Sequence, residues 1–180
     1  AVLRLSGRDA CSVAGRVLRR RGQDRPPVLE SHRARVAVLV DPASGEPIDE
    51  VLVLPMLAPR SFTGEDVVEI QCHGSALIAD RVLRALLASG ARAARPGEFT
   101  ERAFLNGRLD LCQAEAVADL VEASSDAGRA AAWHQLDGAL SRAVQDLHER
   151  LLDLRALVEA HLDFPEDDLA AETEAEIANG

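Results

Sequence analysis

The stretch ARPGEFTERAFLNGRLDLCQAEAVADL, residues 94–120, marks the point where the character of the chain changes. Its first half mixes charged and aromatic residues between a Pro-Gly and an Asn-Gly pair, which predicts a short helix. Glu98 and Glu101 fall in the first turn of this helix, where carboxylates suit the helix dipole. Asn106-Gly107 can end it through a left-handed turn. Its buried side is expected to consist of Phe99, Ala103 and Phe104.

Strand and helix patterns alternate before this stretch. Short β-rich runs at 1–7, 34–40, 49–54 and 67–72 are interspersed with apolar residues at helical spacing in 9–21 and 75–89. A turn rich in Pro, Ser and Gly joins the second and third runs and indicates a hairpin. We therefore predict an α+β fold for residues 1–109, with a mixed β-sheet and helices.

Helices are predicted from Leu111 onward, because Gly-Pro turns and β-branched runs no longer recur. Asp110 can cap the first helix, with Gln113 in the capping-box position, and SSDAG at 124–128 offers a second cap. The next helix carries an apolar seam at spacings of four and three that must be covered by other helices, from another chain or from a part of the protein outside this sequence. The seam residues are Leu140, Val144, Leu147, Leu151, Leu154 and Val158. Pro165, in DFPEDD, is expected to stop this helix.

Composition excludes several classes of protein. With 47% hydrophobic residues the chain should fold, and no apolar run is long enough for a membrane span. Three scattered cysteines without CxxC spacing suit free thiols in a reducing compartment, so a cytoplasmic protein is expected. Residues 121–180 carry 4 Arg against 14 acidic residues, so any contact with nucleic acid should involve other residues or a partner.

Two familiar kinds of catalytic site are missing from the sequence. The five histidines do not form HExxH or a close cluster with cysteine, which argues against a metal site. No GxxxxGK[ST] motif occurs and the chain has no Lys, so the usual phosphate-binding P-loop is excluded. The chain by itself is not expected to hydrolyse a nucleotide.

Two charged residues are candidates for ligand binding. Glu69 lies near the end of the strand at 67–72, where it is either a solvated carboxylate or an acceptor for the N–H edge of a planar heterocycle such as a pterin or guanine. Arg108 follows the Asn-Gly turn. It either forms a salt bridge with Asp110 or Glu101, or offers a planar fork to a carboxylate or phosphate.

Three segments together resemble one family: SFTGEDVVEIQCHG at 61–74, the stretch at 94–120, and LDFPEDD at 162–168. They are similar to the bacterial and organellar tRNA uridine-5-carboxymethylaminomethyl modification GTPases, the MnmE/TrmE family. The resemblance implies an N-terminal domain similar to the tetrahydrofolate-binding domain of aminomethyltransferases, spanning residues 1–109. It also implies that residues 110–180 form the first part of a helical-bundle domain into which a GTPase domain is inserted.

The resemblance further implies a homodimer formed through the N-terminal domain, with 5-formyl-tetrahydrofolate or a related folate bound near the interface. Arg4, Glu69 and Arg108 match the folate-contacting positions of the family. With an FAD- and NADH-dependent partner of the MnmG/GidA type, the family forms 5-carboxymethylaminomethyluridine at the wobble position of tRNA. GTP, potassium and magnesium are expected only in the GTPase domain.

Some parts of the family pattern lie outside this sequence: a Gly-rich leader, the GTPase domain and the returning C-terminal helices. Two alternatives to folate binding are therefore kept. The chain could be a dimerisation scaffold with no ligand of its own, or an aminomethyltransferase-like enzyme acting alone. The helical segment and the 94–120 motif argue against the second.

Overall fold

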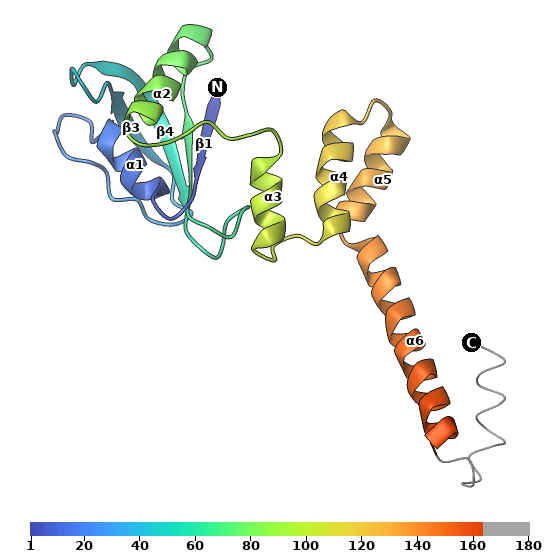
Figure 1. Cartoon of the computed structure of the whole chain (residues 1–180). Helices are drawn as coiled ribbons and strands as arrows, with labels where there is room; N and C mark the ends of the chain where they lie inside the picture. Colours follow the sequence, from blue (N-terminus) through green and yellow to red (C-terminus); the bar gives the residue numbers. More distant parts are fainter. Residues whose placement is uncertain (164–180) are drawn as a thin grey trace. The chain divides into compact units, whose positions relative to one another are not determined.

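The computed structural model describes residues 1–163 of the chain. The chain divides into two compact units, Ala1–Asp110 and Leu111–Gly180. The first unit contains a five-stranded sheet and three helices, and the described part of the second contains helices only (Figure 1). The predicted α+β fold followed by a helical segment is therefore confirmed.

The sheet has the strand order β1-β5-β4-β3-β2 and every described pairing is antiparallel. The expected mixed sheet is therefore corrected to an antiparallel one. The reason is local, because β3, β4 and β5 follow one another in the chain without an intervening crossover helix. The strands are β1 (Val2–Ser6), β2 (Leu18–Arg19), β3 (Arg35–Val40), β4 (Pro47–Met56) and β5 (Val67–Gln71).

The first helix is shorter than the pattern at 9–21 predicted. Helix α1 (Ala10–Val17) ends at Val17, and Leu18 and Arg19 pair with Leu39 and Val38 as strand β2. Leu18 is fully buried in this arrangement. Pairing with a distant strand therefore prevails over the local helical spacing.

One face of the sheet carries the hydrophobic core. Helices α1 and α2 (Ala76–Ala88) pack on this face, where apolar side chains from β3, β4 and β5 point toward them. Val17, Leu39, Val53, Ile70 and Val82 are completely buried there. Burial of these aliphatic side chains is the main contribution to the stability of the first unit.

The opposite face of the sheet exposes apolar side chains. Val2, Leu52 and Val36 lie in one row across the sheet, with Gln71 between Val2 and Leu52, and they are 59%, 37% and 57% exposed. We call this the open face, defined by Val2, Val36 and Leu52. The neighbouring row contains Arg4, Glu69 and Leu54, so an ion pair lies directly beside the open face.

Helix α3 (Glu98–Leu105) ends in a Schellman motif. Gly107 adopts a φ of 68°, its N–H donates to the carbonyl of Phe104, and the N–H of Arg108 donates to the carbonyl of Ala103. The predicted stop at Asn106-Gly107 is confirmed. The predicted buried side is partly wrong: Ala103 is buried, but Phe104 is 41% exposed and the other buried residue is the acidic Glu98.

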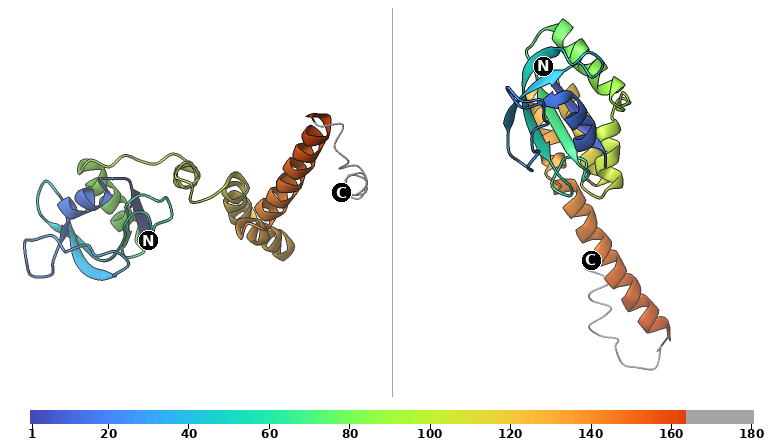
Figure 2. Two further views of the ribbon diagram at one scale, coloured as in Figure 1. Left: turned by 90° about the horizontal axis from the view of Figure 1, so that it is seen from below. Right: turned by 90° about the vertical axis from the view of Figure 1, so that its left-hand side faces the viewer.

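The second unit consists of helices α4 (Leu111–Glu122), α5 (Asp126–Leu136) and α6 (Ala139–Asp163). Helices α4 and α5 lie side by side, and α6 extends away from them (Figures 1 and 2). Ser125 caps α5 as predicted, since its side chain accepts a hydrogen bond from the N–H of Gly128 at 3.1 Å. Of the DFPEDD segment at 163–168, only Asp163 is among the described residues.

The apolar seam of α6 is solvent-exposed over much of its length. Leu140, Val144, Leu147, Leu151 and Val158 are all exposed, while Leu154 is partly buried. Within the described residues, helices α4 and α5 thus leave most of this seam uncovered, and its coverage by other helices stays a prediction. Within residues 1–163, none of the helices combines the length and the apolar character that crossing a membrane requires.

Candidate functional site

Arg4 and Glu69 form a direct ion pair across two neighbouring strands. They are register partners on β1 and β5, and the Arg4 Nε atom lies 2.8 Å from the Glu69 Oε1 atom. A second guanidinium nitrogen also donates to Oε1. Within residues 1–163 the Oε2 atom of Glu69 has no hydrogen-bond partner, so one carboxylate oxygen can still accept from a ligand.

Arg108 packs against the loop that precedes β5. Its Nε atom donates to the backbone carbonyl of Ser61 at 3.1 Å. Among the described residues Arg108 forms no salt bridge with Glu101, which the spacing allowed; Glu101 pairs with Arg95 at 2.7 Å instead. Arg108 is exposed at the surface, so its terminal guanidinium nitrogens can reach a bound anion.

The structure thus pairs Arg4 with Glu69 and places Arg108, the third predicted residue, against a neighbouring loop. This loop is attached to β1 by Ser6, whose hydroxyl donates to the Glu65 carboxylate at 3.0 Å and is hydrogen-bonded to the Thr63 hydroxyl at 2.7 Å. Ser6 lies two residues from Arg4 on the same side of the strand. The connection brings the loop that Arg108 contacts to the same corner of the sheet as the Arg4–Glu69 pair.

Sequence reasoning missed a network of buried charge behind this corner. Glu98 is only 4% exposed, and its carboxylate accepts hydrogen bonds from Arg92, from the backbone N–H of Arg95 and from Arg102. These bonds, that from Arg92 first, hold the pKa of Glu98 far below its usual range. The spacing of four between Glu98 and Arg102 was the one available signal, since such pairs meet on one face of a helix.

Arg102 connects this network to the loop. Its guanidinium donates to Glu65 at 2.8 Å and to Glu98 at 2.9 Å, and these partners raise the pKa of Arg102, with Glu65 having the larger effect. Glu65 in turn accepts from Ser6 on β1. Helix α3, the loop and the edge strand are therefore joined by one chain of charged hydrogen bonds.

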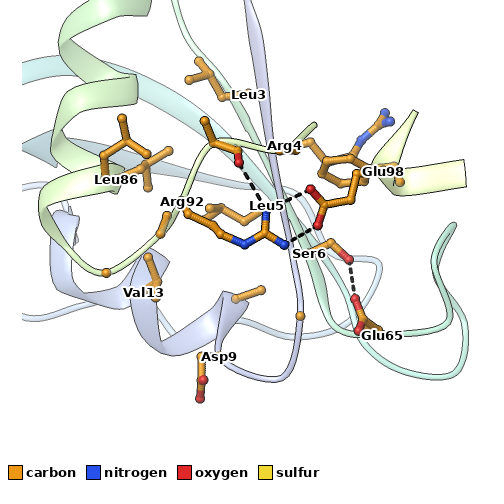
Figure 3. Close-up of a pocket in the computed structure, with 18 of the residues that line it drawn as sticks. Leu3, Arg4, Leu5, Ser6, Asp9, Val13, Glu65, Leu86, Arg92 and Glu98 are labelled. Carbon is orange, nitrogen blue, oxygen red and sulfur yellow. Dashed lines mark hydrogen bonds and ion pairs between the residues drawn. The ribbon is translucent and has the colours of Figure 1, made fainter. Parts of the chain in front are cut away.

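A pocket of about 530 Å³ lies along β1, between α1, α2, the segment after α2 and α3. Figure 3 shows Leu86 and Val13 on one side of it, with Glu98 and Glu65 on the other. Arg4 lines this pocket, whereas Glu69 and Arg108 do not. Its polar wall belongs to the Glu98 network, whose carboxylates already have arginine partners.

His73 is oriented by an acidic partner, Asp49. Its ring and its backbone N–H both contact the Asp49 carboxylate at 2.8 Å. Burial alone would raise the pKa of Asp49, but the two bonds from His73 outweigh burial and lower it. No group of three or more His, Cys, Asp or Glu side chains suited to a metal ion occurs in the described part of the chain.

Gly64 allows Arg108 to pack closely on the loop. Gly64 has a φ of 77°, and a Cβ atom added there would lie 3.1 Å from Cγ of Arg108 and 3.3 Å from Cβ of Asn106. Gly64→Ala is expected to lower the free energy of unfolding by about 1–2 kcal/mol, since both backbone strain and crowding oppose it. Denaturant titration followed by circular dichroism measures this change.

Gly45→Ala is the matched control, because Gly45 has a φ of 73° but no atom within 4 Å of the added Cβ. Both substitutions carry the cost of a left-handed alanine, and only Gly64→Ala adds the contact with Arg108. Equal losses of stability in the two variants would show that the packing of Arg108 on Gly64 contributes nothing.

Comparison with known proteins gives similarity over almost the whole chain. The family model described as "GTP-binding protein TrmE N-terminus" matches residues 1–108, and the "MnmE helical domain" model matches residues 111–180. The proteins named tRNA modification GTPase MnmE from Geobacter sulfurreducens and Symbiobacterium thermophilum are 52% and 50% identical to the chain. The alignments cover 93% and 99% of this chain but 36% and 39% of those relatives.

Proposed function

Because this chain belongs to the MnmE/TrmE family of tRNA modification GTPases, we propose that residues 1–109 bind a folate of the 5-formyl-tetrahydrofolate type and pair two copies of the chain. Residues 110–180 would then supply the first part of the helical domain. The observation that carries the proposal is the Arg4–Glu69 pair, with one carboxylate oxygen of Glu69 still able to accept, beside the open face. The two copies would meet through the open face, so the ligand site and the dimer contact would be neighbours on one sheet.

The chemistry of the three residues suits a folate. A pterin presents a planar edge with adjacent N–H donors, and a carboxylate is the natural acceptor for such an edge. The guanidiniums of Arg4 and Arg108 are permanently charged donors for polar or anionic groups elsewhere on the ligand. Glu69 would therefore orient the heterocycle, and the two arginines would neutralise and fix the rest of the molecule.

In the whole protein, we propose, this part works with a separate GTPase domain that binds GTP, magnesium and potassium. An FAD-dependent partner of the MnmG/GidA type would act with it to form 5-carboxymethylaminomethyluridine at the wobble position of tRNA in the cytoplasm. The chain spans about 36–39% of the length of the relatives it matches. The 180 residues alone are expected to release no phosphate from GTP.

Isothermal titration calorimetry of the chain with 5-formyl-tetrahydrofolate tests the ligand site. Glu69→Ala and Arg108→Ala are each expected to weaken binding by about 1–3 kcal/mol, the scale of a charged hydrogen bond. Arg84→Ala is the control, since Arg84 lies on α2 and pairs with Asp80 at 2.9 Å. Unchanged affinity in both site variants would refute the assignment.

The second candidate is a dimerisation scaffold that binds no folate. It is favoured by the fact that Arg4 and Glu69 already form an ion pair across the strands, as a purely structural pair would. A chain that is dimeric by light scattering, yet shows no heat of binding with 5-formyl-tetrahydrofolate, would support the scaffold instead of the folate site.

A further inference from the structure

Two side chains at the end of α3 attach it to the loop before β5. The Asn106 Nδ2 atom donates to the Thr63 carbonyl at 2.7 Å, and the Arg108 Nε atom donates to the Ser61 carbonyl at 3.1 Å. The two acceptors lie two residues apart, as do the two donors. Asn106 and Arg108 therefore form a two-point contact with one short piece of loop.

The Asn106 side chain is not needed to end the helix. The Schellman bonds from Gly107 and Arg108 already satisfy carbonyls of the last turn. The backbone N–H of Asn106 also has a partner, the carbonyl of Arg102 at 2.9 Å. Within the described residues, the only side-chain hydrogen bond of Asn106 is thus the one to Thr63. This bond holds the loop against the turn at the end of α3.

The acceptor of that bond is itself rigidly placed. Thr63 is completely buried, and its hydroxyl is hydrogen-bonded to Ser6 on β1. The backbone N–H of Gly7 donates to the carbonyl of Asp66 at 3.0 Å, which fixes the other end of the loop to the same strand. Asn106 therefore ties the turn that carries Arg108 to the strand that carries Arg4.

We propose that Asn106 is a positioning residue, which fixes the guanidinium of Arg108 relative to the Arg4–Glu69 pair for contact with an anionic group of the ligand. This inference rests on the proposed folate site. Without the bond to Thr63, the turn could shift on the loop, and Arg108 would be mobile in the free protein. Binding of the ligand would then have to order Arg108. The cost of ordering Arg108 would then reduce affinity.

A double-mutant cycle on the whole chain tests this, with calorimetry of 5-formyl-tetrahydrofolate as the readout. Asn106→Ala is expected to weaken binding about 5- to 10-fold in the native background and not at all in an Arg108→Ala background. Asn106→Leu, which keeps the approximate size, removes the donor to Thr63 and adds no charge beside Arg108, is expected to behave in the same way. Thermal melting confirms that each variant is folded at the temperature of the titration.

The outcomes separate the two claims. If Arg108→Ala leaves affinity unchanged, both the ligand role of Arg108 and the role of Asn106 are refuted. If Arg108→Ala weakens binding but Asn106→Ala has no effect, or has the same effect in both backgrounds, the folate site stands and the positioning role is refuted. If Asn106 had only a general structural role, Asn106→Ala would weaken binding equally in the native and the Arg108→Ala backgrounds, because its effect would not depend on Arg108.

Discussion

Replacing Leu52 by Glu is expected to separate the proposed homodimer into folded monomers. Leu52 lies at the middle of the open face, on central strand β4 between Val36 and Gln71. A second copy seated on this face would bury the new carboxylate without a cationic partner, which is strongly unfavourable. The dimer dissociation constant is expected to rise at least about 100-fold, which corresponds to about 2.7 kcal/mol.

Sedimentation velocity over a range of concentrations measures this change. Leu77→Glu is the matched control, because Leu77 is 69% exposed on α2, which covers the other face of the sheet. It introduces the same charge in place of the same side chain and should leave the dimer intact. A Leu52→Glu chain that dimerises as tightly as the native chain would show that the copies meet through another surface.

Glu98→Gln is expected to give the largest loss of thermal stability among single carboxylate-to-amide changes in the first unit. The change leaves the guanidiniums of Arg92 and Arg102 facing a neutral amide in a nearly buried site. At pH 7 the melting temperature should fall by roughly 5–10 °C. Glu101→Gln, on the same helix with a side chain that is 49% exposed, should change it by less than about 2 °C.

The loss of stability caused by Glu98→Gln should become smaller as the pH falls. The pKa of Glu98 is lowered on folding, so its contribution is fully present above the pKa of the unfolded chain and is lost as the pH falls toward the folded value. The difference between native and Glu98→Gln chains should therefore shrink as the pH drops below about 4.5, the ordinary pKa of the carboxyl. Circular dichroism melts from about pH 3 to about pH 7 measure it. A difference that stays constant over that range would contradict an ionised Glu98 in the folded state.

Local patterns predicted most of the elements because those elements depend on neighbouring residues. The alternation in β3 and β4, the turn between them, and the Asn106-Gly107 stop of α3 are all signals within a few positions of sequence. The end of α1 could not be placed in this way. Leu18 follows Ala14 by four positions, which is helical spacing, and only its partner Leu39 on β3 makes it a strand residue.

The candidate site shows the same division. Glu69 and Arg108 could be singled out by residue type and position, and Arg4 by resemblance to the family. Their partners could not be predicted, because the Ser61 carbonyl lies 47 positions from Arg108 and Glu69 lies 65 positions from Arg4. The burial of Glu98 was missed for a related reason: a carboxylate in a first helical turn looks solvated until its arginine partners are placed around it.

The length of α6 determines how far its end would move if the helix tilted at its link to α5. Helix α6 has 25 residues, a length of about 37 Å at about 1.5 Å per residue, and it follows Gly138, whose φ is 82°. A tilt of about 10° at Ala139 would displace the far end of such a rod by roughly 6 Å. A small rotation at the base of this helix would therefore move its far end by more than one turn of helix.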